Sequence, residues 1–202
     1  MRIVFEGLPG AGKTELALQL ADEFDIPLVP EFACLTEDRW RKFNLKQPFY
    51  QANDEAKEFV GNLFLEPLVL FDRHYISTLA YSYSLQICFG QDPLTGENYR
   101  LTHQWYQQCL AQNKLSKPNI VFFIDVPPKT SIKRKPNAGL IDYVWGQEKS
   151  LSIVRAYYNQ FFKIEEPSVK VIRFDGQRKK ADILSEMKQY LNMLLSGEKN
   201  VS

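Results

Sequence analysis

Short, continuous apolar runs alternate along the chain with longer stretches in which apolar residues recur every three or four positions. The short runs indicate strands buried on both faces, and the longer stretches indicate amphipathic helices. The predicted strands are 2–5, 26–29, 67–71, 119–125 and 169–174. The predicted helices are 15–21, 36–42, 49–65, 77–85, 101–115, 147–163 and 180–195. This alternation indicates an open α/β sheet.

The first predicted strand runs into a glycine-rich turn that opens a helix. The turn satisfies the pattern G-x-x-x-x-G-K-[ST], which is typical of a phosphate-binding loop in this setting. Glycines let backbone N–H groups turn inward around a phosphate, and the helix directs its positive end at the same anion. Lys13, which we expect to face solvent, would reach the β and γ phosphates, and Thr14 would offer its hydroxyl to Mg²⁺. The residues predicted to hold ATP here are Gly7, Gly10, Ala11, Gly12, Lys13 and Thr14. The alternative is a glycine-rich turn with a chance Lys-Thr pair.

Length and charge narrow the class of protein. The chain has 202 residues, of which 45% are hydrophobic and 13% aromatic, as expected for a globular domain with a full core. We expect one domain over 1–196 and a flexible tail over 197–202. The formal net charge is only +1, so no global field favours a nucleic acid polymer or an anionic membrane. The predicted partner is therefore a small molecule.

Cysteine spacing and hydropathy suggest where the protein works. Cys34, Cys88 and Cys109 are far apart and odd in number, which suits neither a disulfide framework nor a metal site. No apolar run approaches the length of a membrane span. We therefore expect a reducing, cytoplasmic location.

Charged residues follow the second, third and fourth predicted strands. Because the carboxyl ends of strands in an open α/β sheet face the ligand crevice, Glu31, Asp72 and Arg73 are candidates for the reacting centre. Asp72 can bind Mg²⁺, and Arg73 can bridge phosphate oxygens. The alternatives are a solvated acid for Glu31 and a structural ion pair for Asp72 and Arg73. Asp125 could support Mg²⁺ or cap the following turn.

Two further segments carry candidate contacts. The stretch 129–147 begins with a basic cluster that includes Arg134, and it could form a lid that closes over a triphosphate. A solvated charged face is the alternative. On the third helix, Gln51 can offer a donor and an acceptor to a base edge, with Phe49 and Tyr50 as walls. The alternative is a helix packed by its aromatic residues.

Several stretches resemble one family. Residues 72–81, DRHYISTLAY, are similar to the thymidylate kinase signature D-R-[YH]-x-x-S-x-x-A-Y. Residues 117–128 resemble that family's P-D-x-x-x-x-L-D-v-x-P strand ending, and 154–158 its helix after the lid. The chain thus resembles the thymidylate kinase and deoxynucleoside kinase branch of P-loop kinases.

This resemblance implies a P-loop NTPase fold with a five-stranded parallel sheet, helices on both faces and a lid segment. It also implies ATP and Mg²⁺ as the donor pair and a homodimeric assembly. The adenine would lie near Asp175, Gly176 and Gln177.

Two departures concern the phosphoryl acceptor. Thymidylate kinases carry R-E-P-G-G-T after the second strand, but this chain has V-P-E-F-A at 29–33 and so lacks the arginine. Glu55 stands where the same family places an arginine on the third helix, and losing both cations disfavours a dianionic acceptor. Residues 29–31 instead resemble the V-P-E-P segment of deoxynucleoside kinases, with Phe32 in place of the second proline. That resemblance implies that Glu31 acts as base toward the 5′-hydroxyl and that Gln51 reads the nucleobase.

We therefore predict an ATP- and Mg²⁺-dependent kinase that phosphorylates a nucleoside or a nucleoside-like hydroxyl. A nucleoside monophosphate kinase of the thymidylate type is the alternative, and a P-loop ATPase or nucleotide switch is a rival of another class. The chain lacks the N-K-x-D run typical of GTPases, which argues against a switch. The predicted catalytic residues are Lys13, Glu31, Asp72, Arg73 and Arg134. The predicted acceptor-binding residues are Phe32, Phe49, Tyr50, Gln51, Glu55, Arg73 and Tyr81.

Overall fold

Five parallel strands form a single sheet at the centre of the molecule. The computed structural model describes residues 1–31, 49–90, 98–137 and 143–197. The strands are β1 (Arg2–Glu6), β2 (Leu28–Val29), β3 (Val69–Asp72), β4 (Ile120–Asp125) and β5 (Lys170–Asp175). Their order in the sheet is β2-β3-β1-β4-β5, and every neighbouring pair is parallel. The prediction of a five-stranded parallel sheet is confirmed.

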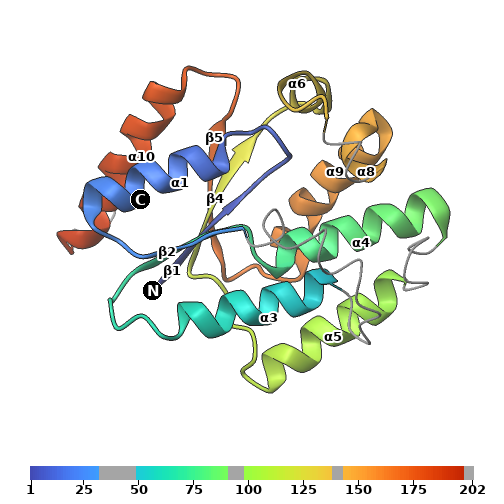
Figure 1. Ribbon diagram of the computed structural model, residues 1–202, viewed down its shortest axis with the longest axis horizontal. Coiled ribbons are helices and arrows are strands. Elements are labelled where there is room, and N and C mark those ends of the chain that lie inside the picture. The colour runs from blue at the N-terminus through green and yellow to red at the C-terminus, as the bar shows by residue number, and fades with distance from the viewer. Residues whose placement is uncertain (32–48, 91–97, 138–142, 198–202) are drawn as a thin grey trace.

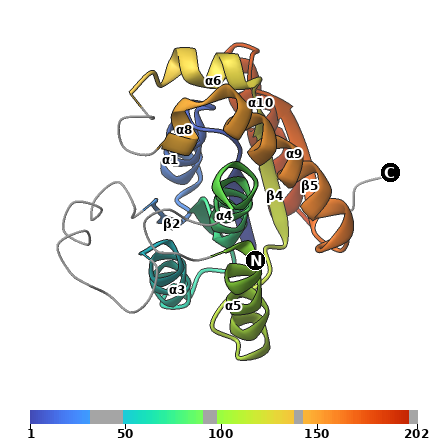
Figure 2. The same cartoon turned by 90° about the vertical axis from the view of Figure 1, so that its right-hand side faces the viewer.

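Helices cover both faces of this sheet. They are α1 (Lys13–Phe24), α3 (Phe49–Gly61), α4 (Tyr75–Phe89), α5 (Tyr99–Ala111), α6 (Pro128–Arg134), α8 (Tyr143–Gly146), α9 (Glu148–Ile164) and α10 (Lys180–Leu195). Figure 1 shows α1 and α10 on one face, with α3, α4, α5 and α9 on the other. The view in Figure 2, turned by 90°, has α4 and α9 in front of β4 and β5. The predicted arrangement with helices on both faces is therefore confirmed.

The apolar composition of the strands follows from the helices that pack on both faces of the sheet. Ile3, Val4 and Phe5 in β1 are fully buried, because helices exclude water from both faces of the central strand. One helix approaches the sheet very closely. A Cβ added to Gly61, the last residue of α3, would lie 2.3 Å from Cζ of Phe71 in β3. A glycine at this position therefore lets α3 lie against β3 and brings the polar residues of the helix next to the end of that strand.

The basic segment after β4 differs from the loop that the sequence suggested. Residues 128–134 form α6, and Pro128 occupies its first turn, where the missing N–H is tolerated. The helix is seated on the phosphate-binding loop, since Oγ of Ser131 donates a hydrogen bond to the carbonyl of Pro9 at 2.6 Å. Further along, residues 143–146 form α8. The lid over 129–147 stays a prediction, and 138–142 lie outside the described residues.

Element bounds shift at several other places. The third helix ends at Gly61 instead of 65, and α4 extends the predicted 77–85 in both directions. The helix expected at 36–42 lies outside the described residues. Nowhere in the described part of the chain is a helix both long and apolar enough to cross a membrane.

Candidate active site

The turn between β1 and α1 has the backbone that its glycines permit. Gly7 has φ +141°, and an added Cβ would lie 2.3 Å from the carbonyl oxygen of Ile124 in β4. Lys13 is buried, and its Nζ donates to the carbonyl oxygens of Gly7 and Leu8 at 3.0 and 2.9 Å. Burial, with a smaller contribution from the charge of Arg73, lowers the pKa of Lys13 to about 7. The ammonium is therefore held inside the loop, and the expectation that Lys13 faces solvent was wrong.

Thr14 and Asp72 come together from α1 and β3. The Thr14 hydroxyl donates to Oδ2 of Asp72 at 2.5 Å, and Asp72 is fully buried. The other oxygen, Oδ1, is buried and has no hydrogen-bond partner among the described residues. An unsatisfied carboxylate oxygen beside a hydroxyl fits Mg²⁺, which prefers oxygen ligands and binds one or two carboxylates together with substrate phosphates. The described residues contain no group of three or more His, Cys, Asp or Glu side chains that could hold a metal.

Arg73 joins the ends of β3 and β2. Its Nε lies 2.9 Å from Oε1 of Glu31, and its Nη1 donates to Ser77 at 3.0 Å and to the carbonyl of Gly7 at 3.3 Å. Its backbone is left-handed, with φ +64°, a conformation that costs a residue with a side chain about 1 kcal/mol or more. Two residues that were predicted separately, Glu31 and Arg73, are thus in contact beside the phosphate-binding loop.

The environment of Glu31 favours its ionised form. Burial raises the pKa of this carboxyl, but the positive charges of Arg73, Lys13 and Lys57 together outweigh burial and hold its pKa below the usual value. The side chain remains about a quarter exposed, so an acceptor could reach it from solvent. Glu31 is therefore a charged hydrogen-bond acceptor rather than a solvated loop acid.

Sequence analysis missed a second carboxylate near Arg73, that of Glu6. Glu6 is fully buried at the end of β1 and accepts hydrogen bonds from the backbone N–H of His74, from Ser77 and from Tyr158 at 3.1, 2.6 and 2.9 Å. Burial raises its pKa. These contacts fasten the start of α4 to β1. An available signal was its position, since Glu6 is an acid that ends a buried strand directly before Gly7.

Helix α3 contributes another buried charge that the sequence did not reveal. Lys57 is 1% exposed, and its Nζ donates to the carbonyl oxygens of both Asp72 and Arg73 at 2.6 Å. One turn earlier, Asp54 accepts a hydrogen bond from Thr78 of α4 at 2.6 Å, and burial raises the pKa of Asp54 to about 7. A lysine on a helix normally indicates a solvated face, so nothing in the sequence pattern marked Lys57.

Aromatic side chains form a continuous series from α3 to α8. Ring centroids lie 5.3 Å apart for Phe49 and Tyr50, 5.0 Å for Tyr50 and Tyr81, and 5.3 Å for Tyr81 and Trp145. The guanidinium of Arg73 lies 5.8 Å from the ring centroid of Trp145. Three predicted acceptor residues therefore lie side by side and lead to the predicted reacting centre. Trp145 was missed, because it falls within the segment that was interpreted only as a lid.

The remaining predicted acceptor residues are on or near α3. Gln51 is buried, 5% exposed, and Glu55 is one turn further along the helix. Oε1 of Glu55 accepts a hydrogen bond from the indole N–H of Trp105 in α5 at 2.8 Å. Glu55 thus contacts α5 in addition to any role toward an acceptor. Phe32 lies outside the described residues.

Asp125 has a different partner from those considered above. Nε and Nη2 of Arg155 donate to the two carboxylate oxygens of Asp125 at 2.6 and 2.9 Å. This bidentate pair links β4 to α9 and occupies both oxygens of the acid. Asp125 therefore acts as the partner of Arg155, and it caps no helix, since α6 has Pro127 at its N-cap.

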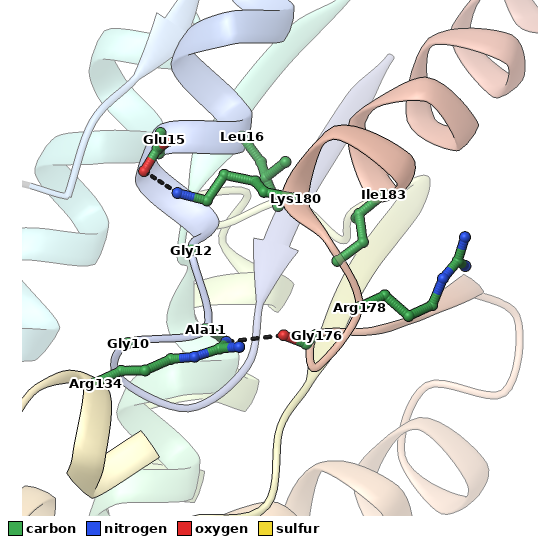
Figure 3. A pocket seen from close by; sticks show the side chains of 10 residues that line it. All are labelled: Gly10, Ala11, Gly12, Glu15, Leu16, Arg134, Gly176, Arg178, Lys180 and Ile183. Carbon is green, nitrogen blue, oxygen red and sulfur yellow. Dashed lines mark hydrogen bonds and ion pairs between the residues drawn. The ribbon is translucent and has the colours of Figure 1, made fainter. Parts of the chain in front are cut away.

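A pocket of about 460 Å³ opens on the outer side of the phosphate-binding loop (Figure 3). Its walls come from the loop, from α1, α6 and α10, and from the turn after β5. The lining residues are Gly10, Ala11, Gly12, Glu15, Leu16, Arg134, Gly176, Arg178, Lys180 and Ile183. Figure 3 shows Arg134 reaching along the loop to the turn, where Nη1 donates to the carbonyl of Gly176 at 2.8 Å. On the opposite side, Lys180 forms an ion pair with Glu15.

Among the residues predicted near the adenine, Gly176 thus lines this pocket. A Cβ at Gly176 would lie 2.5 Å from Cγ1 of Val126 and 2.9 Å from Cγ2 of Ile124, so the turn can approach β4 only with a glycine. Asp175 stabilises the same turn, since its Oδ1 accepts the backbone N–H of Gln177 at 2.9 Å. The pocket therefore joins the loop that would hold phosphates to the turn expected to hold the base.

A family model described as "AAA domain" matches residues 2–128, which span the loop, the Thr14 and Asp72 pair and β4. The chain belongs to the AAA domain family. Two curated proteins are similar to this AAA domain chain over most of its length. A thymidylate kinase of Ureaplasma parvum serovar 3 is 22% identical, covering 98% of this chain and 92% of its own. A probable thymidylate kinase of Methanobrevibacter smithii is 29% identical, covering 78% and 79%.

Solved structures have the same fold. Deoxyadenosine kinase from M. mycoides with bound dATP has a TM-score of 0.70 at 18% identity and covers 95% of this chain and 100% of its own. Thymidylate kinase from Candida albicans has a TM-score of 0.68 at 17% identity and covers 100% and 95%. At this identity the likeness concerns the fold. Together with the two sequence relatives, it confirms the expected branch of P-loop kinases.

Proposed function

We propose that this AAA domain chain is an ATP- and Mg²⁺-dependent kinase that transfers the γ-phosphoryl group to a hydroxyl of a nucleoside. One observation carries the proposal: the Glu31–Arg73 pair lies at the strand ends beside the Thr14–Asp72 pair and the phosphate-binding loop. A carboxylate that can act as base, a guanidinium, and a hydroxyl–carboxylate pair that can hold Mg²⁺ thus lie together at one edge of the sheet. Phosphoryl transfer needs all three, because its catalysis is mainly positioning and charge stabilisation.

Each residue has a defined role in this reaction. Lys13 and the loop backbone bind the β and γ phosphates, while Thr14 and Asp72 hold Mg²⁺. The metal, when bound, neutralises charge on the phosphate oxygens. Glu31 accepts the proton of the acceptor hydroxyl. The hydroxyl oxygen forms a bond to the γ-phosphorus while the bond between that phosphorus and the leaving ADP breaks. Arg73 stabilises the charge of the transferred group, and Arg134 does so from α6.

The aromatic series supports a flat acceptor. Phe49, Tyr50 and Tyr81 provide ring faces for a base, and the amide of Gln51 can pair with its edge. A neutral nucleoside suits position 55 better than a dianion, because Glu55 is an acid. We also propose that Phe32 contributes to this wall.

A nucleoside monophosphate is the second candidate acceptor. The specific observation in its favour is that both sequence relatives described above are named as thymidylate kinases. If the protein acts in this way, thymidylate would be the first substrate to test, and the residues of the phosphate-binding loop would keep the same roles.

An acceptor screen distinguishes these functions. The purified protein is incubated with Mg²⁺ and ATP and with each deoxynucleoside, ribonucleoside or monophosphate in turn, while ADP is measured and the product is identified by mass. Phosphorylation of a nucleoside is the expected result, and it should stop with EDTA and return with excess Mg²⁺. Turnover of monophosphates alone would establish the second candidate. ADP release that no acceptor increases would indicate an ATPase and refute both.

We also propose a lid, the domain bounds, an oligomeric state and a location for this protein. Residues 129–147 act as a lid, of which α6 is the fixed base, since Ser131 and Arg134 hydrogen-bond to the phosphate-binding loop and to the turn after β5. Residues 1–196 form one domain and 197–202 a tail. We further propose a homodimer and a cytoplasmic location, the latter from the cysteine pattern alone.

A further inference from the structure

Lys57 occupies an unusual position for a lysine on a helix. It is 1% exposed, yet it lies outside the set of residues that would touch phosphates, metal or acceptor. Burying an ammonium is unfavourable unless hydrogen bonds and opposite charges compensate. Its Nζ makes two hydrogen bonds of 2.6 Å, both to backbone carbonyls, and these carbonyls belong to Asp72 and Arg73. The buried charge is thus directed at the two residues that carry the chemistry.

The backbone around Arg73 is held at every polar group. The carbonyl of Asp72 accepts from Lys57, and the N–H of Arg73 donates to the carbonyl of Phe5 at 3.1 Å. The carbonyl of Arg73 accepts from Lys57 as well, and the N–H of His74 donates to Glu6. Left-handed backbone at a residue with a side chain persists only where the surroundings fix it. Lys57 supplies two of the four contacts that fix φ of Arg73 at +64°.

We propose that Lys57 is a positioning residue of the phosphoryl-transfer site: it holds the left-handed turn that aims the Asp72 carboxylate at Mg²⁺ and the Arg73 guanidinium at the transferred group. This inference rests on the proposed function, because it assigns Lys57 to the same reaction. Relaxation of Arg73 toward negative φ would move its side chain away from Glu31 and shift Asp72 relative to Thr14. A displacement of about 1 Å at such a site can lower turnover on the order of a hundredfold.

A simpler role for Lys57 is charge compensation for Asp54 within α3. Asp54 is nearly as buried, and its charge is the largest contribution that opposes the burial effect on the pKa of Lys57. The two roles predict different outcomes when both charges are removed. Lys57→Met keeps the length of the side chain but removes the ammonium, and Asp54→Asn keeps the hydrogen-bond acceptor for Thr78. The double variant therefore restores charge balance inside α3 without restoring the contacts to Asp72 and Arg73.

The experiment compares the wild type, Lys57→Met, Asp54→Asn and the double variant. Thermal melting reports the fold, turnover reports kcat and KM for ATP, and titration with a fluorescent ATP analogue gives the nucleotide affinity in EDTA and in Mg²⁺. We expect the double variant to fold and melt cooperatively, at a lower Tm because two buried carbonyls lose their donor, with kcat reduced on the order of a hundredfold. We also expect Mg²⁺ to increase the affinity of the double variant for the ATP analogue much less than it increases that of the wild type. In EDTA the two affinities should agree within a few-fold. Asp54→Asn should retain the Mg²⁺ response.

The outcomes separate this inference from the proposed function. A double variant whose kcat and Mg²⁺ response lie within twofold of the wild type would overturn the positioning role and leave charge compensation. A wild type that gains no affinity from Mg²⁺ and phosphorylates no acceptor would refute the proposed function instead. If Lys57→Met fails to fold alone, the double variant still decides, because its buried charges are balanced.

Discussion

Replacing Gly176 with alanine tests whether the pocket beside the phosphate-binding loop holds the donor nucleotide. The added Cβ would lie 2.5 Å from Cγ1 of Val126, about 1 Å inside an ordinary contact, and 2.9 Å from Cγ2 of Ile124. Relief requires the turn after β5 to move away from β4. Overpacking of this kind costs typically 1–3 kcal/mol. For a protein of this size each kcal/mol lowers Tm by about 2–4 °C, so we expect a loss of about 2–12 °C.

The same movement should weaken nucleotide binding. The carbonyl of Gly176 accepts the hydrogen bond from Arg134 at 2.8 Å and lies in the pocket wall. Moving the turn displaces this wall and the guanidinium that it holds, and each ~1.4 kcal/mol of ATP binding lost in this way would raise KM for ATP about tenfold. At saturating ATP, kcat should fall less than KM rises, because Thr14, Asp72 and Arg73 do not contact this turn and Arg134, which does, is the proposed catalytic residue that the change would disturb.

Melting curves and initial rates over a range of ATP concentrations measure both effects. Gly197→Ala is the matched control, since nothing lies within 4 Å of its added Cβ and it is remote from the pocket. Because Gly197 has a φ of +72°, alanine at this position should lower the stability slightly, but the KM for ATP should not change. A Gly176→Ala protein with lower Tm and an unchanged KM for ATP would refute the assignment of the pocket to the donor. An unchanged Tm would refute the steric argument itself.

Three other substitutions test the reacting centre. Lys13→Met should abolish phosphoryl transfer with little change in Tm, because it keeps the buried stem and removes only the ammonium; normal turnover in the folded variant would refute the kinase function. Glu31→Gln should lower kcat on the order of a hundredfold or more and leave ATP affinity nearly unchanged; equal kcat would remove Glu31 as the base. Glu55→Arg should shift kcat/KM toward monophosphates over nucleosides by about tenfold to a thousandfold, since like charges about 4 Å apart cost roughly 4 kcal/mol at an effective dielectric near 20. Glu55→Gln, which keeps an acceptor for Trp105 and removes only the repulsion, should shift the preference in the same direction by less, and a preference equal to that of the wild type in both variants would contradict the charge argument.

Features set by local sequence were predictable. The loop between β1 and α1 follows from fixed glycine positions, and the apolar spacing of 180–195 gives the bounds of α10 as the structure has them. Strand ends were equally informative. Glu31, Asp72 and Arg73 were chosen because each follows a predicted strand, and parallel strands deliver such residues to one edge. That Glu31 and Arg73 touch could not be read from the sequence, because the contact depends on β2 and β3 being neighbours.

Other features depend on tertiary contacts that leave no local pattern. Lys57 looks like a solvated helix residue until the close approach at Gly61 places its ammonium under the carbonyls of Asp72 and Arg73. Helix α6 was interpreted as a loop because its basic run has no apolar periodicity, although Pro128 at its first turn was an available signal. Ser131 of α6 contacts Pro9 of the phosphate-binding loop although the two residues are far apart in the sequence, so this contact could not be predicted from their positions along the chain.

The central place of β1 has a consequence for how the chain is made. Strand β1 (Arg2–Glu6) leaves the ribosome before the other four strands of the sheet, and among the described strands it pairs with β3 and β4, while α1 is packed against α10, which ends at Leu195. At about 5–20 residues per second, the nascent strand waits several seconds for its first neighbour and longer for the last helix. During that time the apolar residues Ile3, Val4 and Phe5 of this strand and the inner face of α1 remain uncovered. Chaperone capture of ribosome-bound chains should therefore be strongest before residue 125 emerges, and chains truncated ahead of α10 should aggregate instead of forming a smaller stable domain.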